Sequence, residues 1–156
     1  MDMSGTQRIE ASRETVYAAL NDTEVLKQCI PGCETIEMVG ENEMKATVKL
    51  KIGPMKVSFS GKVTLSDLDP PNGYTITGEG SGGVAGHAKG SAKVLLEADG
   101  EATNVNYTVN ADIGGKIAQL GARLIDGTAK KLAAEFFSRL NKVVTGQAAV
   151  PAPAEG

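Results

Sequence analysis

Residues 114–144 read GGKIAQLGARLIDGTAKKLAAEFFSRLNKVV, and this stretch decides the fold. It contains no proline, and its apolar residues recur at steps of three and four, which is typical of a helix with one buried face. The pattern predicts a helix of roughly 40 Å at about 1.5 Å per residue, long enough to cross a whole sheet. The inward set is Ile117, Leu120, Leu124, Ile125, Thr128, Leu132, Phe136, Leu140 and Val143.

The chain before this helix alternates apolar and polar residues, as half-buried strands require. Short turns rich in Gly, Pro, Asn and Asp separate neighbouring strands and favour antiparallel pairing. Because each strand has one apolar face, the sheet needs a single covering layer. Clear strands are predicted at 44–52, 57–65, 84–96 and 105–113, and weaker ones at 3–11, 33–39 and 73–80.

Two short helices are predicted between the first and second strands. Ser12 is placed as the N-cap of the first, and Asp22 or Thr23 as the N-cap of the second, which Pro31 stops. The order of elements predicts an α+β fold. In it, a seven-stranded antiparallel sheet with two short helices after the first strand wraps around the long C-terminal helix.

Composition limits the possible functions. The net charge of -3 shows no basic concentration that would follow a nucleic-acid backbone, so no nucleic-acid partner is expected. No apolar run is long enough to cross a bilayer, and the first residues lack the pattern of a secretory signal. We therefore expect a cytoplasmic protein with reduced thiols. Residues 1–145 are expected to form a single domain, and residues 146–156 a disordered Pro/Ala tail.

Nineteen glycines and the absence of tryptophan leave little side-chain volume on the inward face of the later strands. Two interpretations remain open: the small residues draw helix and sheet together, or they leave a pocket walled by larger apolar residues. A large empty cavity costs several kcal/mol, so a pocket would be filled in use or open to water. Within the pocket, Tyr107 or Thr128 would donate a hydrogen bond to a ligand carbonyl. The candidate ligand-binding residues are Leu50, Phe59, Gly61, Ile76, Gly78, Ala88, Gly90, Tyr107, Ala111, Leu120, Leu124 and Thr128.

The reactive side chains do not assemble a recognisable catalytic or metal site. Cys29 and Cys33 lack the further ligands that a metal needs and the spacing of a redox pair, so a tight turn with buried thiols is favoured. His87, the single histidine, falls on the outer face by alternation, where no Ser/His/Asp set can form. We expect no metal and no covalently bound cofactor.

Residues 52–55, at the turn between two predicted strands, combine apolar side chains with flanking lysines. Outward lysines on a sheet usually keep it soluble and block edge pairing. The alternative is that this tip contacts an acidic partner or an anionic membrane surface. The candidate contact residues are Ile52, Gly53, Pro54 and Met55.

Three segments, in this order, resemble the family of the carbon monoxide dehydrogenase G subunit, which belongs to the START-like (helix-grip, SRPBCC) superfamily. They are residues 25–34 (VLKQCIPGCE), residues 51–61 with KIGPM and FSG, and residues 115–127 (GKIAQLGARLIDG) followed by Phe136 and Phe137. The resemblance spans residues 1 to about 145. It implies a helix-grip sheet with a hydrophobic cavity between the sheet and the C-terminal helix.

The resemblance also implies a function. Members of this family accompany aerobic molybdenum-containing carbon monoxide dehydrogenases and related hydroxylases, and are thought to attach the enzyme to the cytoplasmic membrane or to carry a lipophilic electron acceptor such as a quinone. A non-catalytic accessory subunit with a bound lipophilic ligand, at the inner face of that membrane, is therefore expected.

Two alternatives remain open. A START-like enzyme acting on a small hydrophobic substrate would need an ionisable pair inside the pocket, and the strand alternation provides no clear one. Glu34 or Glu135 buried beside the pocket would favour this alternative. A pure assembly or recruitment factor would instead have its pocket packed shut.

Overall fold

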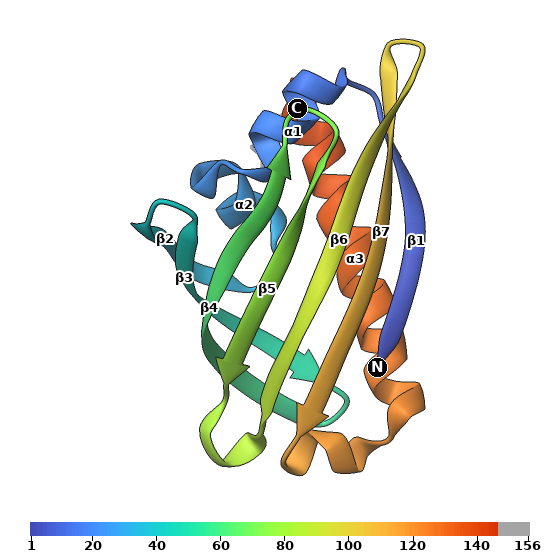
Figure 1. The fold of residues 1–156 in the computed structure, drawn as a ribbon. Helices are drawn as coiled ribbons and strands as arrows, with labels where there is room; N and C mark the ends of the chain where they lie inside the picture. The colour runs from blue at the N-terminus through green and yellow to red at the C-terminus, as the bar shows by residue number, and fades with distance from the viewer. Residues whose placement is uncertain (147–156) are drawn as a thin grey trace.

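The computed structural model describes residues 1–146 (Figure 1). Apart from Gly146, the predicted tail lies outside these residues. The elements in chain order are β1 (Asp2–Ile9), α1 (Arg13–Leu20), α2 (Thr23–Cys29), β2 (Cys33–Gly40), β3 (Glu43–Ile52), β4 (Met55–Asp69), β5 (Gly73–Ser81), the short 3-10 helix η1 (Gly83–Ala85), β6 (His87–Asp99), β7 (Ala102–Gly114), the 3-10 helix η2 (Lys116–Leu120) and α3 (Ala122–Val144).

The strands form one seven-stranded antiparallel sheet in the order β1-β7-β6-β5-β4-β3-β2. From β2 to β7 each strand pairs with its neighbour in the chain, and β1 closes onto β7. The sheet curls around α3, and α1 and α2 cover one end of its concave side (Figure 1). The predicted α+β architecture is confirmed.

The two short helices begin where their capping residues predict. The Ser12 hydroxyl accepts a hydrogen bond from the backbone N–H of Thr15 at 3.3 Å. The Asp22 carboxylate accepts one from the backbone N–H of Glu24 at 2.9 Å, which resolves the choice of N-cap in favour of Asp22. Each cap satisfies a backbone donor that has no partner inside its helix.

One end of the molecule, which we call the core end, is filled by large side chains. There α1, α2 and the second half of α3 pack against the sheet. Ile9, Val16, Val105 and Leu140 are each at most 1% exposed. The buried Thr103 hydroxyl donates to the carbonyl of Ala11 at 2.8 Å, so it is satisfied as well. This end provides the main hydrophobic core.

The opposite end, which we call the loop end, comprises the β3–β4 turn, η1, and η2 with the first turn of α3 (Figure 1). These segments touch one another. A Cβ placed on Gly53 would lie 2.7 Å from Leu124 Cδ2, and one on Gly86 would lie 2.8 Å from Ile117 Cγ1. A small second cluster, built around Ile52, Val57 and Ile117, closes this end.

Two predicted boundaries at the loop end are wrong, and glycine explains both. The C-terminal helix does not run on from residue 116, because Gly121 takes a φ of 96° and separates η2 from α3. The remaining helix of 23 residues is roughly 35 Å long. The predicted strand 84–96 begins only at His87, because Gly86 adopts a φ of 142° and the three residues before it form η1.

Candidate ligand-binding site

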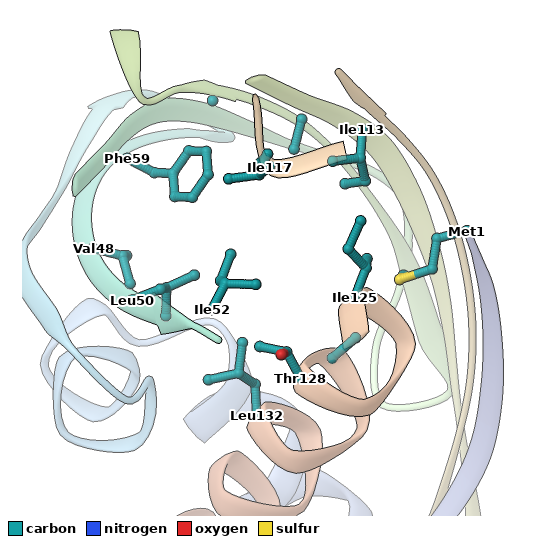
Figure 2. A pocket seen from close by; sticks show the side chains of 13 residues that line it. Met1, Val48, Leu50, Ile52, Phe59, Ile113, Ile117, Ile125, Thr128 and Leu132 are labelled. Atoms are coloured by element: carbon teal, nitrogen blue, oxygen red, sulfur yellow. The ribbon is translucent and has the colours of Figure 1, made fainter. Parts of the chain in front are cut away.

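A cavity of about 350 Å³ lies between the concave face of the sheet and the first half of α3. Figure 2 shows its side chains surrounding an empty space. The volume falls in the lower part of the range of about 300–1,000 Å³ that is usual for small-molecule sites. The lining residues are Met1, Val48, Leu50, Ile52, Phe59, Gly80, Ala88, Ile113, Ile117, Ile125, Thr128, Ala129 and Leu132.

Apart from Met1, three parts of the fold supply this lining. Strands β3 and β4 give one wall, where Val48 and Phe59 stand opposite each other in register. Strands β5, β6 and β7 give the floor, and η2 and α3 give the cover. On α3, Ile125, Thr128 and Leu132 are three and four residues apart, which places them on one face of the helix.

The lining presents no polar surface to the cavity. Its one side-chain hydroxyl, that of Thr128, donates to the backbone carbonyl of Leu124 at 2.9 Å, so its proton is already used within the helix. The protein surface that a molecule in the cavity meets is apolar. Because an unpaired polar group loses its hydration there without compensation, the site favours hydrocarbon.

A second hollow of about 340 Å³ continues from the cavity along the concave face of the sheet. The two spaces share Val48, Phe59, Gly80 and Ala88. Small residues of β5, β6 and β7, among them Gly78, make up much of the second floor. The space along the sheet is therefore elongated.

The glycines of this floor fall into two kinds. A Cβ on Gly61 or Gly90 would collide with the backbone of the neighbouring strand, so these positions need glycine for close strand approach. A Cβ on Gly78 or Gly80 would meet its nearest atom at 3.4 or 3.6 Å, which is ordinary contact. Since the backbone does not demand glycine at 78 and 80, the missing side chains there leave space.

A void of this size is costly when it stays empty. At roughly 24 cal/mol per Å³, a sealed and dry cavity of 350 Å³ would cost about 8 kcal/mol. The whole stability of a domain is only about 5–15 kcal/mol. The cavity is therefore expected to hold a guest or to admit water.

Nine of the twelve candidate ligand-binding residues lie along this space. Whether they contact a ligand stays a prediction. Leu50, Phe59, Ala88 and Thr128 line the cavity, and Phe59, Gly61, Ile76, Gly78, Ala88, Gly90 and Ala111 line the adjoining hollow.

Three candidates lie elsewhere. The Tyr107 ring stacks on Phe137 with centroids 5.3 Å apart, beyond the lining of either space. Leu120 belongs to the cluster that closes the loop end. Leu124 is 36% exposed and rests against Gly53. Gly121 interrupts the chain between η2 and α3, so the helical spacing does not hold across it, and the two predicted residues nearest the break, Leu120 and Leu124, lie outside the lining.

The prediction also missed lining residues that the sequence signals. Val48 and Ile52 alternate with outward lysines on β3, and Ile113 continues the inward face of β7. Ile125 and Leu132 were in the predicted inward set of the helix. The alternation and the helical spacing identified their direction, but only the fold shows how far along each element the cavity extends.

Ile52 does not lie at an exposed tip, as the sequence suggested. It is 8% exposed and lines the cavity. Met55 packs against the same small cluster, Gly53 is half-buried, and only Pro54 among the four candidate contact residues is exposed. The last residue of a strand keeps the inward direction set by alternation even where the chain turns.

The remaining reactive groups stand away from the cavity. Burial raises the pKa of the Cys29 thiol to about 11, and burial also raises the pKa of Cys33, so both favour the protonated form. His87 is exposed on the outer face, as predicted. Glu34 pairs with Lys49 at 3.1 Å and Glu135 with Arg139 at 3.9 Å; neither carboxylate lines the cavity.

Within residues 1–146, no cluster of His, Cys, Asp and Glu side chains has the size that a metal ion requires. No helix in the same stretch is long and apolar enough to cross a membrane.

Sequence comparison matches residues 5–145 to the family described as the G subunit of carbon monoxide dehydrogenase (CoxG). The chain belongs to the CoxG family. No protein of curated function is similar enough in sequence to match this CoxG-family chain. Among solved structures, a conserved protein from Geobacillus kaustophilus is similar at 30% identity, with a TM-score of 0.89 over 94% of this chain and 96% of the other.

More distant structures share the fold of the CoxG-family chain. A START superfamily protein from Mycobacterium smegmatis has 15% identity and a TM-score of 0.67, over 91% of this chain and 98% of the other. An aromatase/cyclase from Streptomyces sp. R1128 has 12% identity and a TM-score of 0.63, over 95% and 99%. These similarities confirm the START-like fold.

Proposed function

We propose that the protein is a non-catalytic accessory subunit of a molybdenum carbon monoxide dehydrogenase-type system, and that it holds a lipophilic molecule in the cavity. The observation that carries this proposal is an apolar space of about 350 Å³ that extends into a second hollow. Membership of the CoxG family supports the choice of partner enzyme. The role includes linking that enzyme to the membrane in which the molecule dissolves.

A quinone is the ligand that this proposal favours, held by its hydrocarbon part. An elongated apolar trough matches an isoprenoid chain better than a compact polar molecule. Neither Tyr107 nor Thr128 is placed to donate a hydrogen bond to a carbonyl in the cavity, since one lies outside it and the other donates within α3. The proposal therefore assigns neither side chain to the quinone head group.

A catalytic role would need a group able to move a proton next to the substrate. The cavity lining has no carboxylate, imidazole or thiol. An assembly factor with a closed interior does not need the space that the structure contains. These two observations favour a carrier over the alternatives.

The test is to add a quinone to the purified protein and follow thermal unfolding. At about 100 times the dissociation constant, a ligand of the folded state adds about 2.7 kcal/mol. For a chain of this size, that raises the midpoint by roughly 5–10 °C. Protein isolated from its native membrane fraction should also release a quinone into organic solvent, detectable by mass spectrometry.

Two variants on adjacent residues test whether the shift depends on the cavity, one blocking it and the other serving as the control. Ala88→Phe places a ring in the space, because Ala88 lines both hollows, and it should abolish the shift. His87→Phe places the same phenyl ring on the exposed outer face of the same strand, in place of the imidazole, and should keep the shift. Equal shifts in both variants, or no quinone and no shift in the unmodified protein, would show that the cavity is not a quinone site.

A further inference from the structure

The three segments of the loop end, residues 51–56, 82–87 and 115–124, carry charge of one sign. They contain Lys51, Lys56, Lys116 and Arg123, all exposed, and not a single Asp or Glu. The turns at the core end are opposite in character: residues 40–43, 66–73 and 98–102 contain six carboxylates and no Lys or Arg. A chain with a net charge of -3 thus presents a basic surface at one end.

Two of these cations are placed at a cost to the fold. Lys51 and Lys56 stand directly opposite each other across β3 and β4. Like charges at such a position repel and weaken the strand pair. Within the part of the chain that the structure describes, neither forms an ion pair. The facing pair Lys45 and Lys62 differs, because Lys62 forms an ion pair with Glu43. An uncompensated pair of cations at an exposed turn points to a role outside the fold.

Exposed apolar side chains stand among these cations. Val84 in η1 is 85% exposed, the highest value among the large apolar residues of the described chain. Pro54 is exposed at the β3–β4 turn, and Leu124 is 36% exposed beside it. Apolar tips surrounded by Lys and Arg are suited to the boundary between lipid headgroups and acyl chains.

We propose that the loop end docks onto an anionic lipid bilayer, with Val84 and Pro54 entering the headgroup layer and Lys51, Lys56, Lys116 and Arg123 contacting lipid phosphates. An acidic protein surface would pair with the cations but would not account for the exposed apolar side chain of Val84. The proposal rests on the proposed function, because it explains how a water-insoluble ligand reaches the cavity.

The position of the cavity supports a lipid partner. Ile52 and Ile117 belong to the cluster that closes the loop end, and both also line the cavity. A single layer of side chains therefore separates the ligand space from the docked surface. Glycines with positive φ flank this layer at Gly53, Gly115 and Gly121, where the backbone can change direction without Cβ strain.

Vesicle sedimentation tests the docking. The protein should bind vesicles of phosphatidylcholine mixed with phosphatidylglycerol, bind phosphatidylcholine vesicles far more weakly, and lose binding as salt is raised. The double variant Lys51→Gln, Lys56→Gln should bind the anionic vesicles roughly 25-fold more weakly, at about fivefold per lysine. Val84→Ser should weaken binding roughly tenfold through lost apolar burial.

The chain offers a matched control. Lys45 and Lys62 also face each other across β3 and β4 on the outer face of the sheet, but away from the loop end. Lys45→Gln, Lys62→Gln removes the same charge and should change vesicle binding less than about threefold. Equal loss in the two double variants, or no preference for anionic vesicles, would overturn the docking proposal. The docking proposal would also be overturned if the loop-end lysine variants bound anionic vesicles normally and lost only binding to the purified dehydrogenase.

Thermal shift by added quinone in vesicle-free solution separates this proposal from the previous one. None of the substituted side chains lines the cavity, so all of these variants should keep the shift. A protein that shows the shift but ignores anionic vesicles refutes only the docking. A protein that binds the vesicles but shows no shift keeps the docking surface and refutes the quinone carrier.

Discussion

The core end and the loop end are built on the same strands and the same helix, yet they differ in packing and charge. At the core end α3 contributes Leu140, which is fully buried among large side chains. In its first half, α3 contributes Ile125 and Leu132, which border an open space. The difference shows that the two halves of α3 have separate roles. The second half stabilises the fold, and the first half leaves space for a ligand.

An aromatic group lies between the two ends. Phe137 stacks on Tyr107 at a centroid distance of 5.3 Å and meets Phe136 edge to face at 5.1 Å. These rings occupy the concave side where the core gives way to the hollow. Large rings fill the interior at this level, whereas Gly78, Gly80 and Ala88 leave it open further along the strands.

The largest expected effect separates the two ends of α3. Leu140→Ala should lower the free energy of unfolding by about 2–5 kcal/mol, because it opens a void in a well-packed region. Ile125→Ala should cost about 1 kcal/mol or less, because Ile125 already borders empty space. Urea unfolding of both variants measures the difference. Similar losses at the two sites would mean that the cavity is closed in solution.

The next effect concerns access for a small reagent. Because burial raises the pKa of Cys29 to about 11, its thiolate is scarce at pH 8, and alkylation should be about two orders of magnitude slower than for a free thiol. In a Cys33→Ser background, Ala88→Cys adds a thiol at the cavity, which an uncharged maleimide should label much faster than Cys29. Mass spectrometry of the two sites over time gives both rates. Comparable protection at the two positions would contradict an accessible cavity.

A smaller effect separates the two kinds of floor glycine. Gly90→Ala should destabilise the protein by about 1–3 kcal/mol, since its methyl group would press on the backbone of β7. Gly80→Ala should be neutral or stabilise it by up to about 1 kcal/mol, since contact distances there are ordinary and the unfolded chain loses freedom. Thermal unfolding of these two variants tests whether the absence of a side chain at Gly80 serves to leave space in the cavity. A large cost at Gly80 would show that it serves strand approach instead.

The sequence was sufficient to predict the sheet, the C-terminal helix apart from its start, and most of the residues along the apolar trough, although it left open whether those residues enclose space or pack together. Alternation along β3 and β4 placed Leu50 and Phe59 inward, because a half-buried strand must send every second side chain to one face. Spacing failed where glycine changes the backbone, at Gly121 and Gly86. The alternation pattern also did not distinguish Gly90 from Gly80. The two differ in their distance to the neighbouring strand, which a local sequence pattern does not reveal.

The smallest effect tests the polarity of the cavity. Thr128→Val replaces the only hydroxyl of the lining with a methyl group while keeping a β-branched side chain. Because that hydroxyl donates to the carbonyl of Leu124, its removal should leave the affinity for a quinone within about twofold and stability within about 0.5 kcal/mol. A direct hydrogen bond to the ligand would instead be worth about 0.5–1.5 kcal/mol, up to roughly tenfold in affinity. Calorimetry suits the titration, because the chain has no Trp whose fluorescence could report binding. A tenfold loss in Thr128→Val, with affinity retained in Thr128→Ser, would place a polar group of the ligand against α3 and reverse the orientation proposed for the quinone.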